Sequence, residues 1–186
     1  MNELVRIRAA PVGFAADAFT ASDFLLMLEL GALEDMRAEL VGGVLEKMSP
    51  AHGDHSTQNA MVVVKLARAL GEEACIAVDL AVVIGDKTVR GIDIAIAHGK
   101  FPKGPASGSD VLMAVEIAET TLARDLGPKA FEYARAGIAT YWVVDLDGRV
   151  VHVMTEPGEN GYALREVIRF GEPIAVPGST ETIIID

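Results

Sequence analysis

The sequence predicts an α/β domain whose strands form a mixed β-sheet. Segments with helical periodicity alternate along the chain with runs rich in Val and Ile. Two of these runs, at residues 89–97 and 111–118, are almost continuously apolar, as strands buried on both faces of a sheet are. Asp-Gly at 147–148 and Asn-Gly at 160–161 are typical of hairpin turns and predict antiparallel strands near the C-terminus. This order of helices and strands indicates an α/β fold with a mixed sheet.

The N-terminal part begins with the signals of a capped helix. Thr20 and Asp23 have the spacing of a capping box and precede the apolar run FLLMLEL, so we expect a short helix that stops near Gly31. Residues 39–48 look extended, and a Gly-Gly pair inside them marks a tight turn or a bulge. The remaining elements are expected in this order: a helix at 55–70, strands at 74–84, 89–97 and 111–118, a helix at 125–135, and strands at 141–146, 150–155 and 162–168.

The composition fits one domain of ordinary size. The chain has 186 residues, 51% of them hydrophobic, and its 16 basic and 27 acidic side chains give a net charge of −11. The apolar content excludes disorder as the main state, and the acidic balance excludes an indiscriminate nucleic-acid binder, which needs clustered Lys and Arg. A lone cysteine, Cys75, excludes an internal disulfide framework and fits a reducing compartment. We expect residues 1–19 to form an N-terminal arm and residues 20–186 to form a single domain.

Neither a signal peptide nor a membrane span is expected. Pro11, Gly13 and Asp17 interrupt the weakly apolar N-terminal stretch, whereas a signal peptide needs an unbroken apolar core of roughly 7–15 residues. No run reaches the roughly 18–20 uncharged apolar residues of a membrane span. The sequence therefore predicts a cytoplasmic protein.

Two acidic residues lie inside otherwise apolar strands. Asp93 interrupts the run GIDIAIA, and Glu116 interrupts LMAVEIA. A buried carboxylate without a partner is costly, so each should meet a cation, a hydrogen-bond network or a metal ion. If the two strands are neighbours, the carboxylates converge and repel each other unless a divalent cation, for which Mg²⁺ or Mn²⁺ is best suited, lies between them. For either acid taken alone, a solvated strand end or a partner of an Arg or Lys is the favoured interpretation.

A second set of candidates lies on the helix that follows. Asp125, Lys129 and Tyr133 are spaced four apart and fall on one helical face. Taken separately, Asp125 can be the N-cap of this helix, Lys129 a surface cation and Tyr133 a packing residue. An acid in one strand, an acid in the next and a lysine on the following helix together favour a functional site.

The segment VEIAETTLARDLGPKAFEYARAGIATYWVVDLDGRVVHV resembles the signature of the Uma-two family of restriction endonucleases, which belongs to the PD-(D/E)XK nuclease superfamily. The family pattern has Val-Glu-Val, a Ser/Thr-rich turn, Asp-x-x-x-Lys-x-x-x-Tyr, and then Gly-Val-x-x-Tyr-Trp-x-Val-Asp. Upstream, AELVGGVLEKMSPAHGDH and RGIDIAIA are similar to its Glu-Leu-x-x-Gly and Arg-Pro-Asp stretches, and VPGSTETIIID resembles its closing Pro-Gly segment. The resemblance runs from about Thr20 to the C-terminus. The positions that match the long signature are Glu116, Thr120, Asp125, Lys129, Tyr133, Gly137, Tyr141, Trp142 and Asp145.

The resemblance implies a restriction-endonuclease-like core, with a mixed sheet flanked by helices and additional C-terminal β-hairpins. It implies that Asp93 and Glu116 bind the metal ion. It also implies that Glu39 is an accessory acid and a third metal ligand, and that Lys129 is the catalytic lysine. Many nucleases of the superfamily carry this lysine two residues after the second acid, where this chain has Ala118, so the role passes to Lys129.

The implied chemistry is Mg²⁺- or Mn²⁺-dependent hydrolysis of DNA phosphodiester bonds. The metal ion held by Asp93 and Glu116 would polarise the phosphate and lower the pKa of a bound water. Lys129 would orient that water or offset charge in the transition state, and Glu39 would hold a second ion or a water of the first. Asp125 is a further accessory candidate.

The partners expected are DNA and a second copy of the chain in a homodimer, with no membrane. His55 is either a substrate contact or a capping or packing residue at a helix N-terminus. DNA would bind weakly through a local basic rim. The nearest rim candidates are Arg90, Lys100, Lys103, Arg124 and Lys129. The alternative from a different class is a catalytically weakened nuclease fold that serves as a binding or assembly module, and an enzyme acting on another phosphate ester also stays open.

Overall fold

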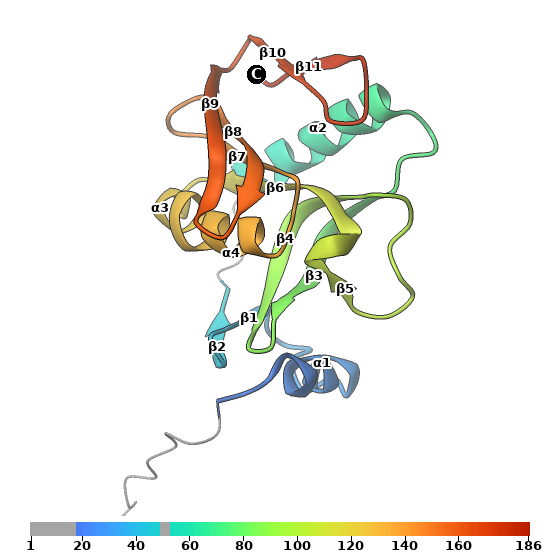
Figure 1. Ribbon diagram of the computed structural model, residues 1–186, viewed down its shortest axis with the longest axis vertical. Helices are drawn as coiled ribbons and strands as arrows, with labels where there is room; N and C mark the ends of the chain where they lie inside the picture. The colour runs from blue at the N-terminus through green and yellow to red at the C-terminus, as the bar shows by residue number, and fades with distance from the viewer. Residues whose placement is uncertain (1–17, 49–52) are drawn as a thin grey trace, which may run out of the picture.

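The computed structural model of the protein describes residues 18–48 and 53–186, and its central feature is a nine-stranded mixed sheet (Figure 1). The main path through the sheet is β2-β1-β4-β6-β7-β8-β9, and β3 lies beside β4 with β5 next to it. Strands β6 and β7 run parallel, as do β3 and β5, and the other neighbours are antiparallel. The strands are β1 (Ala38–Val41), β2 (Val44–Lys47), β3 (Ile76–Gly85), β4 (Thr88–Ala97), β5 (Ala106–Ser107), β6 (Val111–Ala118), β7 (Thr140–Asp145), β8 (Val150–Gly158) and β9 (Gly161–Arg169).

Helices and a small second sheet cover the two faces of the main sheet. The helical elements are α1 (Ala21–Glu29), α2 (Gly53–Leu70), the 3-10 turn η1 (Gly108–Asp110), α3 (Leu122–Arg124), the π-helical turn η2 (Asp125–Lys129) and α4 (Ala130–Arg135). On one face, α2 packs together with β10 (Pro173–Ala175) and β11 (Thr182–Ile184) over Trp142 and its neighbours. On the other face, α4 packs over Tyr141. Among the described residues, every helix is too short or too polar to cross a lipid bilayer.

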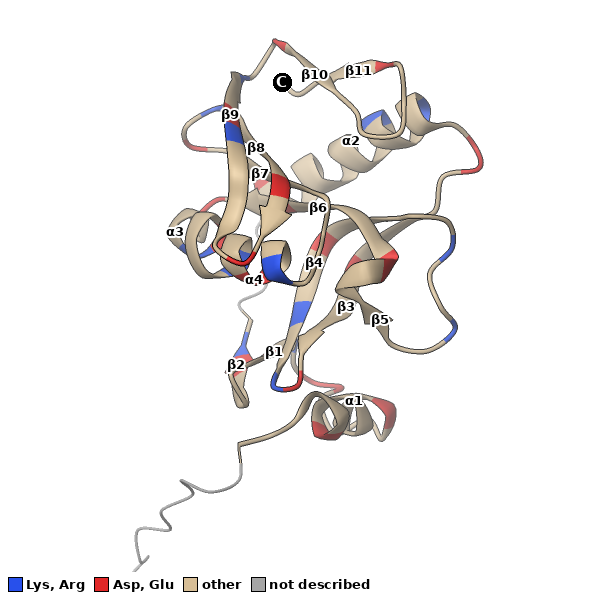
Figure 2. Cartoon of the chain, in the orientation of Figure 1, with Lys and Arg blue, Asp and Glu red and all other residues tan. Residues whose placement is uncertain are grey.

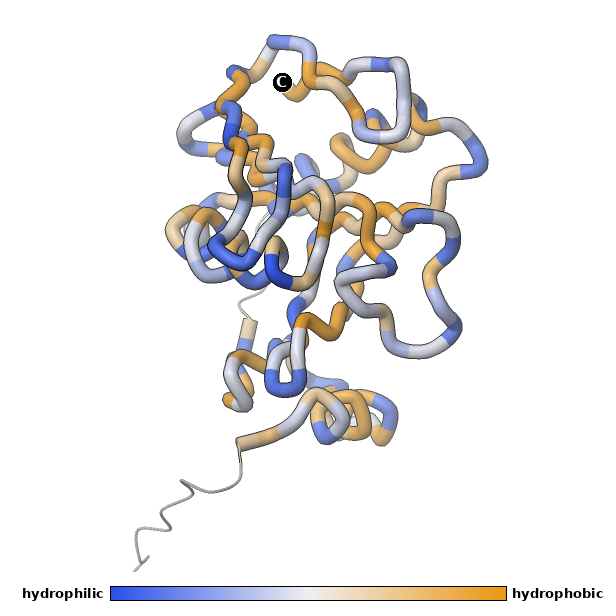
Figure 3. The backbone as a smooth tube through the Cα atoms, viewed as in Figure 1, coloured by the Kyte–Doolittle hydropathy of each residue, from blue (hydrophilic) through white to orange (hydrophobic). Residues whose placement is uncertain are grey.

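The buried strands are those that the apolar runs predict. All of β7 and almost all of β4 and β6 are buried, and apolar residues mark this central region in Figure 3. The mixed α/β architecture with C-terminal hairpins is therefore confirmed: β8 and β9 form one hairpin, and β10 pairs with β11 in another. The expected arm at residues 1–19 lies almost entirely outside the described residues, so the domain limits stay predictions.

The capped helix and the glycine turn of the N-terminal part are confirmed. The N–H of Asp23 donates to Oγ1 of Thr20 at 3.2 Å, and the N–H of Thr20 donates to Oδ2 of Asp23 at 2.9 Å. Gly42 and Gly43 join β1 to β2 with φ of 57° and 85°, the left-handed conformation that a two-residue hairpin turn requires. A side chain at Gly43 would also bring its Cβ to within 2.5 Å of the Cβ of Ala18.

The helix after β6 differs from the expected one. It begins at Leu122 rather than at 125, and its middle is the wide turn η2, which contains Pro128. Asp125 is therefore not an N-cap; Thr121 occupies that position. Proline lacks an N–H and collides with the carbonyl one turn earlier in a regular α-helix, so the wider turn lets the helix continue past it.

Strand β4 has one edge that two other strands share. Along its first edge β4 pairs with β3 over its whole length: Thr88 is opposite Gly85 at one end, and Ile96 is opposite Ile76 at the other. On its second edge, β1 pairs at Val89 and β6 pairs only from Ile94 to Ala97. Residues 90–93 therefore lie in a gap between two ladders, which we call the ladder gap. Backbone groups in such a gap need side-chain partners, because unpaired buried N–H and C=O groups are costly.

Candidate functional site

The ladder gap is where the predicted site residues meet. Lys129, fully buried on η2, places its Nζ 3.0 Å from Oε1 of Glu116 on β6 and 3.4 Å from Oε1 of Glu39 on β1. The same Nζ lies 4.0 Å from Oδ1 of Asp125, one turn earlier on η2. Three acids from three different elements therefore surround one ammonium group.

Asp93 and Glu116 lie at the point where strands β4 and β6 separate. Ile94 and Val115 are the last pair of the β4–β6 ladder. The next pair in the same register would be Asp93 and Glu116, but the backbone pairing ends before these two residues. The N–H of Ile117 instead donates to Oδ2 of Asp93 at 2.8 Å. The two acids face one another where the backbone ladder has stopped, as the sequence predicts for neighbouring strands.

Backbone groups of the ladder gap are satisfied by the site's own side chains. The N–H of Gly91 donates to Oε1 of Glu39 at 3.0 Å, and the carbonyl of Gly91 accepts from Nζ of Lys129 at 3.4 Å. Together with the bond from Ile117 to Asp93, these contacts replace the missing strand-to-strand bonds. Removing a site residue would therefore disturb the sheet as well as the site.

Arg90 links the site to helix α4 and is itself buried, with 2% of its surface exposed. Its Nη1 donates to Oε2 of Glu39 at 2.9 Å, while Nε and Nη2 bind the two oxygens of Glu132 at 2.7 and 3.0 Å. This two-pronged geometry is specific to the planar guanidinium. Arg90 thus binds the oxygen of Glu39 that Lys129 does not contact, and it holds α4 against β4.

Two hydroxyl groups complete the hydrogen bonds of the acids. Tyr133 on α4 donates from its buried phenol to Oε1 of Glu116 at 2.7 Å. Thr121 donates to Oδ2 of Asp125, and Oδ1 of Asp125 has no hydrogen-bond partner among the described residues. His55 lies in the first turn of α2, and its Nε2 is 3.2 Å from Oδ2 of Asp93.

Burial and neighbouring charges shift the pKa values of these groups in opposite directions. Burial raises the pKa of Glu116 to about 8; the ammonium of Lys129 opposes this shift, and the charges of Asp93 and Asp125 add to it. Burial also raises the pKa of Asp125. Burial disfavours the ammonium form of Lys129, but the surrounding acids, led by Glu116 and then Glu39, outweigh it and raise the pKa of Lys129. Lys129 is therefore charged while Glu116 holds a proton near neutral pH.

The two other acids keep their charge despite burial. Burial favours a neutral Glu39, but Lys129 and Arg90 outweigh it and lower the pKa of that carboxyl. Burial likewise favours a neutral Asp93, and the hydrogen bonds from His55 and from the Ile117 N–H lower its pKa. The bond to Asp93 raises the pKa of His55 in return.

The donor set fits a hard divalent cation at two of the three predicted ligands. Among the described residues no donor reaches Oδ1 of Asp93 or Oε2 of Glu116, so each acid keeps one oxygen available. Mg²⁺ is commonly held by one or two carboxylates, with waters and substrate phosphate as the other ligands. Both oxygens of Glu39, in contrast, are engaged by Arg90, Gly91 and Lys129. No group of three or more His, Cys, Asp or Glu in residues 18–48 and 53–186 is arranged to hold a metal ion.

Two candidates for the basic rim are not on the surface, contrary to the expectation from the sequence. Arg90 and Lys129 are buried in ion pairs, because strands and helix close over them, so neither belongs to a surface rim. Lys100 and Lys103 are exposed on the segment between β4 and β5, and Arg124 is partly exposed at the end of α3. Figure 2 shows Lys and Arg distributed over many elements and interspersed with acids.

Sequence reasoning missed the partners that hold the site in place. Glu132 carries no signal of its own, since a glutamate on a helix is usually a solvated residue. A stronger signal was available at Arg90, a cation inside an apolar strand, because a buried guanidinium requires acidic partners. A hollow of about 470 Å³ that opens beside His55 is also unmarked in the sequence. Its lining includes Arg37, His55, Asn59, Val63, Val78 and Asp79.

Comparisons with known proteins agree with this fold. A crystal structure described as a putative nuclease belonging to DUF820, from Anabaena variabilis ATCC 29413, superposes with a TM-score of 0.62. The two chains are 18% identical, and the match covers 77% of this chain and 83% of that one, which shows a shared fold. No curated protein matches the sequence. The family model Uma2, described as putative restriction endonuclease, matches residues 21–184. The chain therefore belongs to the Uma2 family of putative restriction endonucleases.

Proposed function

We propose that the protein is an endonuclease that hydrolyses phosphodiester bonds of DNA with Mg²⁺, or Mn²⁺, as its cofactor. One observation carries the proposal: Asp93 and Glu116 face one another with a free oxygen each, beside the buried ammonium of Lys129. An arrangement of two carboxylates and a lysine suits a reaction in which negative charge develops on a phosphate. Membership of the Uma2 family supports the same reaction.

Asp93 and Glu116 are the proposed metal ligands, through Oδ1 and Oε2. Bound there, the divalent ion would polarise the scissile phosphate and lower the pKa of a water molecule. Glu116 must release its proton to bind a cation, because burial holds its pKa at about 8. The bond from Ile117 keeps Asp93 oriented toward Glu116 during this exchange.

Lys129 is the proposed catalytic lysine. Its ammonium would offset charge on the phosphate or orient the attacking water. Glu39 and Asp125 hold this ammonium from two sides, so in our proposal both are positioning residues. The role of Glu39 as a metal ligand stays a prediction, and its contacts favour the positioning role.

His55 is a proposed substrate contact. Its Nε2 bonds to Asp93, and the ring borders the hollow of about 470 Å³ beside α2. Its Nδ1 is buried without a partner among the described residues. DNA would reach this region with help from the exposed cations Lys100, Lys103 and Arg124, and its binding would weaken steeply with salt.

Nicking of supercoiled plasmid tests the proposal. Wild type should nick in Mg²⁺ or Mn²⁺ and stop on addition of EDTA. Asp93→Asn keeps an oxygen for the Ile117 N–H but removes the charge, so its rate should fall by roughly 100-fold or more. Asp147→Asn makes the same change at an exposed turn and should leave the rate unchanged. Equal nicking by wild type and Asp93→Asn would overturn the catalytic assignment.

A second candidate function is a catalytically weakened nuclease fold that binds DNA or assembles without cleaving it. Two observations favour it: Ala118 stands where many nucleases of the superfamily have the lysine, and the described residues lack a ready three-ligand metal site. Retention of DNA by wild type in a gel-shift experiment, without nicking in either metal, would support this function over the first.

We further propose that the protein works as a cytoplasmic homodimer. Duplex DNA has two strands to cut, and each chain offers one pair of facing acids, so two copies would supply one site per strand. The single cysteine fits a reducing compartment.

A further inference from the structure

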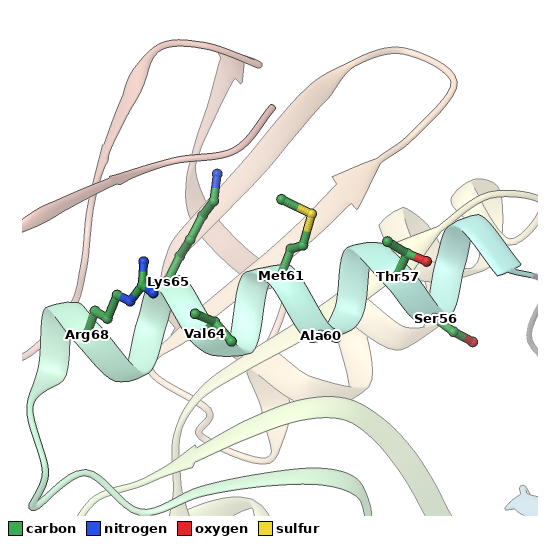
Figure 4. Close-up of a pocket in the computed structure, with 7 residues that line it drawn as sticks. All are labelled: Ser56, Thr57, Ala60, Met61, Val64, Lys65 and Arg68. Atoms are coloured by element: carbon green, nitrogen blue, oxygen red, sulfur yellow. The ribbon is translucent and has the colours of Figure 1, made fainter.

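The outer face of helix α2 carries an exposed apolar stripe. Met61 is 43% exposed and Val64 is 47% exposed, whereas Val62 and Leu66 anchor the helix to the sheet through its opposite face. Figure 4 shows Thr57, Met61, Val64, Lys65 and Arg68 following one another along the helix. An open hollow of about 580 Å³ runs beside them. The stripe is thus unused by the packing of its own chain.

The stripe has the spacing of a helix-pairing seam. Asp54, Thr57, Met61, Val64 and Arg68 follow one another at alternating intervals of three and four residues. This is the heptad spacing that places side chains along one line of contact between two helices. Exposed Ile184 on β11 extends the apolar surface beside the C-terminal part of α2.

The charges at the two ends of the stripe are complementary under a twofold axis. Asp54 lies in the first turn of α2 and Arg68 in the last, each seven residues from Met61. If two copies of α2 pack antiparallel about Met61, Asp54 of each helix faces Arg68 of the other. A parallel pair would instead set like charges together. The antiparallel pair also opposes the two helix dipoles.

We propose that two copies of the chain associate through α2, packed antiparallel with Met61 near the twofold axis. Closed twofold pairing of one self-complementary patch is the commonest form of homo-oligomer. Helix α2 carries two bases, Lys65 and Arg68, and one acid, Asp54, in a chain of net charge −11, so this helix adds no net negative charge to the contact. The exposed Leu164 and Val167 of β9 cannot form such a stripe, because residues three apart point to opposite faces of a strand.

This interface sets the spacing of the two sites. His55, which contacts Asp93, lies six residues before Met61. At about 1.5 Å per residue, the two His55 side chains would stand about 18 Å apart along the helix pair. This interface rests on the homodimer proposed above. It can be tested independently of catalysis, because the measurement is the molecular mass in solution and not the rate of DNA cleavage.

Sedimentation equilibrium of the full chain at micromolar concentrations tests the interface. Wild type should have twice the 19.7 kDa mass of one chain. Met61→Glu should raise the dissociation constant at least tenfold, since it buries two facing carboxylates. The control Leu164→Glu, at a similarly exposed apolar position on β9, should remain dimeric. A monomeric wild type, or a dimer that Met61→Glu leaves intact, would show the proposal to be wrong.

A charge swap tests the antiparallel arrangement and guards against simple misfolding. Asp54→Arg and Arg68→Asp should each weaken the dimer about tenfold, because each sets like charges together across the interface. The double variant, in which the charges are exchanged, should recover most of the wild-type affinity. If the double variant does not recover the dimer although its circular dichroism is unchanged, the antiparallel arrangement is wrong.

A different outcome would assign this surface to DNA. In that case wild type and all variants have the mass of one chain, and the substitutions change the retention of DNA. Asp93→Asn should be dimeric and inactive, which separates this inference from the nuclease proposal.

Discussion

The backbone N–H of Ile117 donates a 2.8 Å hydrogen bond to the carboxylate of Asp93, at the point where strands β4 and β6 part. A proposed metal ligand therefore also serves as a substitute for a missing strand-to-strand bond. The same holds for Glu39, which accepts the N–H of Gly91, and for Lys129, which donates to the Gly91 carbonyl. If the proposed roles hold, stability and activity are coupled in this site, and substitutions can be chosen to separate them.

Asp93→Ala should be less stable than Asp93→Asn. Alanine leaves the buried N–H of Ile117 without an acceptor, which costs about 1–3 kcal/mol, whereas the asparagine oxygen can still accept. Urea denaturation of both variants, compared with Asp147→Asn, measures the difference in the free energy of unfolding. Equal stability of the two Asp93 variants would show that the bond contributes nothing.

Lys129→Met should destabilise the protein by roughly 3–5 kcal/mol, because it leaves buried acids without their cation. Adding Glu39→Gln should recover part of this loss, since Glu39 is the buried acid that keeps its charge and it becomes neutral. A double-mutant cycle in urea would yield a coupling energy of at least about 1 kcal/mol. Strictly additive effects would contradict the pairing of Lys129 with Glu39.

The metal-free protein should lose stability as the pH rises toward 8. A glutamate ordinarily has a pKa of 4.5, whereas burial in the folded chain raises the pKa of Glu116 to about 8. Between these two values the folded state holds a proton that the unfolded state has released, so the free energy of unfolding falls with increasing pH. In EDTA, the Tm of wild type should drop by several degrees more than that of Glu116→Gln between pH 5 and pH 8, as roughly 1 kcal/mol corresponds to about 2–4 °C. A parallel pH dependence of the two proteins would contradict this origin.

Arg90→Lys should fail to replace Arg90. The single ammonium of a lysine cannot bind both oxygens of Glu132 and one oxygen of Glu39 at the same time. The two acids would therefore lose hydrogen bonds that the planar guanidinium makes. We expect a loss of roughly 1–3 kcal/mol in the free energy of unfolding. Plasmid nicking should fall as well, because Glu39 would no longer hold Lys129. The exposed ion pair of Arg37 with Asp79 offers a matched control, and Arg37→Lys should be close to neutral.

The sequence predicts the site because its chemistry conflicts with its surroundings. Asp93 and Glu116 stand out as acids within apolar strands, and burial is what makes such positions informative. Lys129 is found through its spacing from Asp125 and from Tyr133, which survives in the structure even though the turn between the first two is π-helical. A four-residue interval does not distinguish an α turn from a wider one, so the spacing alone is equally compatible with an N-cap role for Asp125.

The remaining part of the site depends on pairings that no local pattern contains. Arg90 and Glu132 are 42 residues apart, and their contact exists only because η2 and α4 fold back over β4. The ladder gap likewise arises from where β1 and β6 end along the same edge. Strand signals predict that these strands exist, but the register of non-local pairs follows from the packing of the whole sheet. Arg90 is for this reason expected at the surface from the sequence and is found in the interior.

The ladder gap also separates a less stable part of the molecule, α1 with the β1–β2 hairpin, from the more stable strands β6 and β7. Phe24, Leu33 and Leu40 form a small cluster with Val89 that is separate from the two larger cores. Beyond this cluster, α1 and the β1–β2 hairpin are tied to the site through the polar contacts of Glu39. Native-state hydrogen exchange should therefore find amides of β1 and β2 opening well before those of β6 and β7. Each such opening would remove Glu39 from Lys129, so closing of the hairpin would complete the arrangement of acids around that ammonium.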